Sequence, residues 1–139
     1  MVTRYQRLGK AVSFLGVLAN IFTLALGPHL LGVAIFATCA LFQALAVVGY
    51  RMVAKARFSG LVFIWLGVGA HILSGLFGFF AATGIVFLAL FILALVSAIG
   101  TTISLQLSKT NKVIIISGGI IGIFIFIYLI VAVAFRAFS

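Results

Sequence analysis

His71 is the residue with the clearest potential for chemistry in this 139-residue chain. Gly67 and Gly75 lie four residues before and after it, so a helix would place one glycine a turn to either side of the imidazole. Such space beside an imidazole is what a haem b needs around an axial ligand. Two other roles stay open, which are a proton relay and a structural histidine that is hydrogen-bonded to a neighbouring helix or to water. An ionisable group inside a membrane is a functional candidate by default.

The remaining composition excludes most other chemistry. The chain has no Asp or Glu, which removes carboxylate acid–base catalysis, carboxylate-bound metals and the usual intramembrane proton carrier. Cys39 is the single cysteine, so no internal disulfide and no cysteine-based zinc or iron–sulfur site can form. His29 is the only other histidine, and it is expected at a turn, too far in depth from His71 to share one haem. We therefore predict no catalytic site, no metal site and no cofactor, with haem b on His71 as the alternative.

The composition also decides the class of protein. Hydrophobic residues make up 66% of the chain and charged residues 6%, whereas a soluble domain averages about 45–50% and about 25%. Nine basic residues cannot form the polar shell of a soluble core. Since a chain in lipid must satisfy its backbone internally, helices are expected. The sequence predicts an all-α integral membrane protein, with residues 1–139 as a single domain.

Basic residues divide the chain into spans. The uncharged runs 11–50 and 58–108 would extend about 60 and 75 Å as single helices, against a hydrocarbon core of about 30 Å. Each must therefore fold back once. The first turn is expected at Gly27-Pro28-His29 and the second at 80–84, with Thr83 as a helix N-cap. The result is a bundle of about five transmembrane helices with short loops, over approximately 9–26, 29–50, 58–80, 84–107 and 113–135.

The charge pattern predicts how these spans are oriented. With five spans, every basic residue except Arg136 falls on the side of the N-terminus. The positive-inside rule makes that side cytoplasmic and places the C-terminus on the outer side. Arg51, Lys55 and Arg57 form the densest basic loop and are expected to contact anionic lipid head groups. Nucleic acid is not expected as a partner, because no aromatic residues are interleaved with these charges.

Small and polar residues mark two helix-contact seams. In the first span they follow a spacing of three and four residues and so share one face of a helix; they are Ser13, Gly16, Asn20 and Thr23. The last span carries Gly118 and Gly122, the small-xxx-small pattern at which helix backbones approach closely. One seam can be used inside the chain, and we expect the other, the glycine pair of the last span, to contact another subunit.

Three functions compete at this point. The first is a non-catalytic subunit of a larger membrane complex, most plausibly respiratory or electron-transferring, with the active centres in partner subunits. The second is a haem-carrying membrane subunit that uses His71. The third is a self-assembling, lipid-associated structural protein of a filament or a virion membrane. A channel for a small uncharged solute, lined by Ser97 and Thr101 of the fourth span, is a weaker fourth.

Overall fold

The computed structural model describes residues 3–27, 29–78 and 84–138, and within these ranges it is helical without strands. Each of its helices is long and apolar enough to cross a membrane. The all-α class is therefore as predicted, and the number of helices that could span a membrane equals the predicted number of spans. In chain order the helices are α1 (Arg4–Ala25), α2 (Leu30–Ala54), α3 (Gly60–Phe77), α4 (Gly84–Ser104) and α5 (Lys109–Phe138).

Side-chain caps explain why α1 and α5 begin earlier than the hydropathy pattern predicts. The Thr3 hydroxyl accepts a hydrogen bond of 3.2 Å from the backbone N–H of Gln6, so α1 starts at Arg4 rather than near residue 9. The Ser108 hydroxyl accepts one of 3.2 Å from the N–H of Asn111. Residues 109–112, predicted as a loop, are consequently the first turn of α5.

The first predicted turn has the expected backbone. Gly27 follows the C-cap of α1 with φ of +74°, the left-handed conformation that glycine adopts without a steric penalty. Pro28 and residues 80–83, including the predicted N-cap Thr83, lie outside the described residues. The connection between α2 and α3 is shorter than predicted, because α2 continues as far as Ala54.

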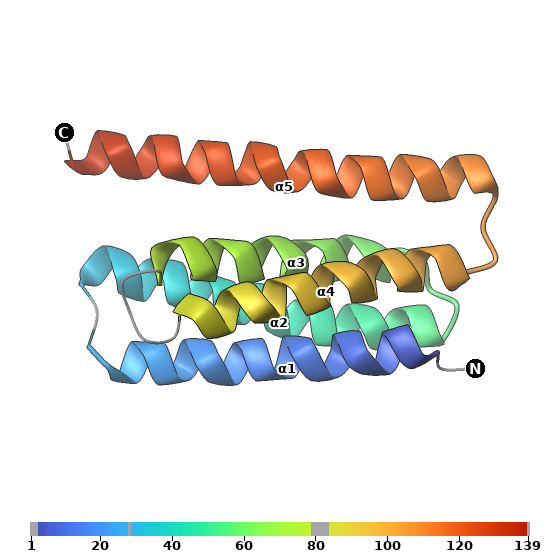
Figure 1. Cartoon of the computed structure of the whole chain (residues 1–139), viewed down its shortest axis with the longest axis horizontal. Coiled ribbons are helices and arrows are strands. Elements are labelled where there is room, and N and C mark those ends of the chain that lie inside the picture. Colours follow the sequence, from blue (N-terminus) through green and yellow to red (C-terminus); the bar gives the residue numbers. More distant parts are fainter. Residues whose placement is uncertain (1–2, 28, 79–83, 139) are drawn as a thin grey trace.

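The helices run up and down, and four of them form a group beside which α5 lies (Figure 1). The N-terminus and the α2–α3 and α4–α5 connections share one end of the molecule, whereas the C-terminus lies at the other end. We call the first of these the basic end, because Arg51, Lys55, Arg57, Lys109 and Lys112 lie in or beside its two connections. The alternation matches the prediction from the charge gaps.

The core lies around α3. Of the 18-residue apolar stretch of α3, 67% is buried, compared with 6% for that of α5. Gly49 of α2 and Gly60 of α3 bring these helices close together, since a Cβ on Gly49 would lie 2.5 Å from the carbonyl oxygen of Gly60. Ile64 and Val68 of α3 then pack with Val12 of α1 and Ala98 of α4. The helix with the candidate histidine is therefore the one most enclosed by its neighbours.

Candidate functional site: a buried polar cluster and an open groove

Three amide and hydroxyl side chains meet inside α1–α4. The Asn20 amide nitrogen donates to Gln43 Oε1 at 2.6 Å and to the carbonyl oxygen of Gly16 at 3.1 Å. The Ser74 hydroxyl donates to Asn20 Oδ1 at 3.2 Å. All three side chains are fully buried. Asn20 therefore links α1, α2 and α3 through a buried network, in which the Gln43 amide nitrogen is left without a hydrogen-bond partner among the described residues.

His71 lies beside this network, and backbone carbonyls surround it. Its Nδ1 lies 2.8 Å from the carbonyl oxygen of Gly67, and its Nε2 lies 3.3 Å from that of Val12. A neutral imidazole has one N–H and donates to one of these oxygens at a time. A Cβ on Gly16 would lie 2.7 Å from His71 Nε2 and 2.8 Å from Gln43 Nε2, so both nitrogens press against that glycine. This contact requires a glycine at position 16.

The surroundings of His71 do not fit a haem. A Cβ on Gly67 would collide with the side chain of Ala46, and one on Gly75 would lie 2.8 Å from Leu88 Cδ2. The glycines on either side of His71 thus allow close packing of α2 at Gly67 and of α4 at Gly75. His29 is exposed beside the first residue of α2. In this structure the two sides of His71 at Gly67 and Gly75 are therefore occupied by α2 and α4, and both ring nitrogens lie near backbone carbonyls.

The first predicted seam faces the inside of the chain. Ser13, Gly16, Asn20 and Thr23 are all buried, and Thr23 donates to the carbonyl oxygen of Ala19 at 2.8 Å. The contacts of Gly16 and Asn20 are with α2 and α3. This seam is occupied within the chain and is not available to another subunit.

Three of the hydroxyls of α4, those of Ser97, Thr102 and Ser104, bond back to their own helix. Ser97 donates to the carbonyl oxygen of Leu93 at 2.7 Å, and Thr102 donates to that of Ala98 at 2.8 Å. Such local bonds are the usual use of Ser and Thr in an apolar helix. The hydroxyl of Thr101, the other residue predicted to line a channel, is buried and has no hydrogen-bond partner in the part of the chain that the structure describes. Among the described residues, no three His, Cys, Asp or Glu side chains come together as a metal site would require.

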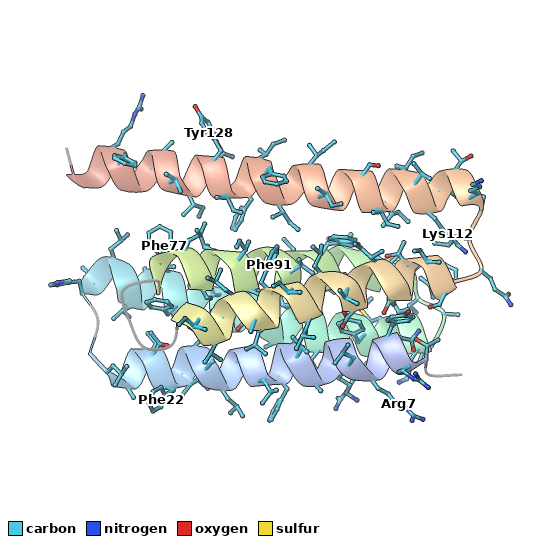
Figure 2. All side chains as sticks on the ribbon, viewed as in Figure 1. Arg7, Phe22, Phe77, Phe91, Lys112 and Tyr128 are labelled. Atoms are coloured by element: carbon cyan, nitrogen blue, oxygen red, sulfur yellow. The ribbon has the colours of Figure 1, made fainter. Side chains whose placement is uncertain are left out.

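The basic residues stay at the surface. Arg51, Lys55 and Arg57, the predicted head-group ligands, are all exposed. Lys112 is half-buried and donates to the carbonyl oxygen of Ile103 at 2.6 Å. Figure 2 shows Lys112 at the basic end and Arg7 pointing outwards from α1. Because the chain has no acidic side chain, these cations form no salt bridges with side chains of the chain.

The second predicted seam is uncovered. A Cβ on Gly118 or Gly122 would meet nothing within 4 Å, whereas one on Gly119 would lie 2.5 Å from the Trp65 ring. Ile123 is the one buried side chain among those the structure describes for α5. Figure 2 shows Tyr128 pointing away from the other helices. Helix α5 thus contacts the bundle along one face, which runs from Ile115 through Gly119 and Ile123 to Ile130, and leaves its other side exposed.

Beside that face lies an apolar groove between α3 and α5, with a volume of about 610 Å³. We call it the α3/α5 groove. Its floor is formed by buried residues, namely Leu61, Trp65, Gly69 and Ile123, and its rim by exposed ones that include Val62, Leu66, Gly118 and Gly122. The sequence analysis did not predict this groove. The sequence feature that could have predicted it is the set Gly118, Gly119 and Gly122. Three residues without side chains on one helix leave a hollow wherever no neighbouring residue fills the space.

No protein-family model, curated protein or solved structure matches the chain. Function is therefore argued from these sites alone.

Proposed function

We propose that the protein is a non-catalytic integral membrane subunit of a larger membrane complex, and that α5 contacts the partner. The observation that carries this proposal is the pair Gly118 and Gly122, which is exposed and has nothing within 4 Å of either Cβ position. Lipid gives helices no hydrophobic reason to associate, so a small-residue seam acts only when another helix packs on it. The other seam, on α1, is already used inside the chain.

A partner of different sequence is favoured over a second copy. Parallel copies joined through α5 would bring Lys109 and Lys112 of both chains together with no acidic side chain to offset them. The absence of carboxylates, together with a histidine fully engaged by helix packing, supports active centres located in partner subunits. Among membrane complexes we favour a respiratory or electron-transfer complex, because a small, loop-poor, carboxylate-free bundle suits a peripheral or bridging position there.

The proposed orientation places the basic end in the cytoplasm, where Arg51, Lys55 and Arg57 would contact anionic lipid head groups. The grouping of the basic residues at one end of the molecule supports it. Reporter fusions after Lys55 and at the C-terminus should then report opposite sides of the membrane. Reporters that agree with each other would refute the orientation.

Assembly is tested by Gly122→Leu in the full chain, purified from its native membrane in a mild detergent. A leucine at the open seam should block close approach of a partner helix while leaving insertion and the α1–α4 contacts intact. We expect partner proteins to co-purify with the wild type and to fall at least tenfold with the variant. Ala89→Leu, at an exposed position of α4, is the matched control.

Two results would overturn the subunit proposal. The first is a wild-type protein that is monomeric in every mild detergent. The second is equal recovery of the partners with Gly122→Leu and Ala89→Leu. The identity of the partners tests the electron-transfer class, since redox subunits should be among them.

A further inference from the structure

We propose that the α3/α5 groove is a binding site for one anionic phospholipid. One acyl chain lies on the groove floor, and the phosphate lies at the basic end. The length of the groove, the closeness of α3 and α5 at its floor and the charge at its end support this site.

The groove extends through about one leaflet. On α5 its lining runs from Asn111 to Phe126, and on α3 it reaches Gly69 from Phe58, just before the helix. At 1.5 Å per residue these stretches correspond to about 22 and 16 Å, whereas one leaflet contributes about 15 Å of hydrocarbon. The groove therefore begins at the basic end and reaches approximately to the bilayer midplane, the path of one lipid tail.

The closeness of α3 and α5 at the groove floor favours a lipid tail over a helix there. A helix with side chains is about 10–12 Å across, whereas a Cβ on Gly119 of α5 would already lie 2.5 Å from the Trp65 ring of α3. A flexible acyl chain is narrow enough to enter. A partner helix would instead cross the rim at Gly118 and Gly122, so the lipid site does not depend on the proposed partner.

Charge selects the kind of lipid. Asn111 and Phe58 line the end of the groove. Lys112 and Arg57 do not line it themselves, but they are adjacent in sequence to these two residues. Lys112 uses one of its three N–H donors on the Ile103 carbonyl, which leaves two for a phosphate oxygen. No acidic side chain in the sequence can neutralise either cation. A head group with net negative charge, at the polar end of a tail-sized groove, complements both features.

Trp65 provides the measurement, because it is the single tryptophan and forms part of the groove floor. The full chain is purified and reconstituted into phosphatidylcholine vesicles with a small fraction of phosphatidylglycerol or phosphatidylcholine brominated on the acyl chain. Bromine quenches tryptophan fluorescence on contact. From two basic side chains, reduced by solvent screening, we expect brominated phosphatidylglycerol to quench at about five- to tenfold lower mole fraction.

Two pairs of variants separate the head-group site from the tail site. Arg57→Gln with Lys112→Gln should abolish the preference for phosphatidylglycerol, whereas Arg7→Gln with Lys10→Gln, which removes the same charge from α1, should leave it in place. Val62→Phe fills the groove from its rim and should reduce quenching by both lipids. Val96→Phe, at an exposed position of α4 outside the groove, should not.

Equal quenching by the two brominated lipids overturns the anionic selection. A preference that survives the Arg57 and Lys112 changes overturns the position of the head group. Weak quenching by both lipids, unaffected by Val62→Phe, shows that a helix or a second copy covers the groove instead. Each of these results is separate from the recovery of partners with Gly122→Leu, so the two proposals can fail independently.

Discussion

Helices α3 and α5 are built from similar residues and differ in what surrounds them. Both are apolar and rich in glycine, yet the glycines of α3 meet Ala46 and Leu88, whereas Gly118 and Gly122 of α5 meet nothing. The most apolar 18-residue stretch of α5 has a higher mean hydropathy than that of α3, yet it is the less buried of the two. In a soluble protein the more apolar helix would be the more buried one. In lipid the apolar side chains gain nothing by leaving the surface, so small and polar residues such as Asn20 and Ser74 share the interior with apolar ones such as Ile64.

The largest loss of stability is expected from a substitution where α2 and α3 cross. In Gly49→Leu the new side chain meets the backbone of Gly60, which cannot move away, so we expect the free energy of unfolding to fall by about 3 kcal/mol or more. Gly118→Leu enters open space and should change it by less than about 0.5 kcal/mol. Unfolding of both variants in detergent, followed by circular dichroism, measures the difference. Equal losses would mean that α5 is covered in the free chain.

A smaller effect is expected from the buried amide. In Asn20→Leu the side chains of Gln43 and Ser74 lose a partner, and we expect a loss of about 1–2 kcal/mol, since hydrogen bonds between membrane helices contribute modestly. Asn111→Leu, on the exposed first turn of α5, should lie within about 0.5 kcal/mol of wild type. The same unfolding assay serves for this pair. If both asparagines behave alike, the polar network does not link α1, α2 and α3.

The smallest expected effect concerns His71. Protein from haem-supplemented cells should show no Soret band, and His71→Gln should leave the visible spectrum unchanged, because α2 and α4 occupy the space beside the ring. A Soret band in the wild type that disappears with His71→Gln would show that α3 opens to a cofactor. The distinction between a packed α3 and an open α5 would then fail.

Part of the site could be read from the sequence. The 3–4 spacing of Ser13, Gly16, Asn20 and Thr23 places them on one helix face, and that face is buried. The Gly67–His71–Gly75 spacing was equally regular, but it could not show whether the glycines admit a cofactor or another helix. Spacing along one helix carries no information on what approaches that helix. The α3/α5 groove was missed for the same reason, since Trp65 and Gly118 lie far apart in the sequence.

The sequence by itself determined the class, the number of spans and the alternation of the chain. These follow from local quantities, namely hydropathy, the length needed to cross the bilayer, and the absence of charge between the basic residues. The tertiary structure decided which seam is enclosed and which stays open, and it placed Gln43 beside His71. These outcomes depend on the rotation and packing of each helix about its neighbours. In lipid that rotation is set by contacts between helices rather than by hydrophobicity, and such contacts exist only after the helices have met.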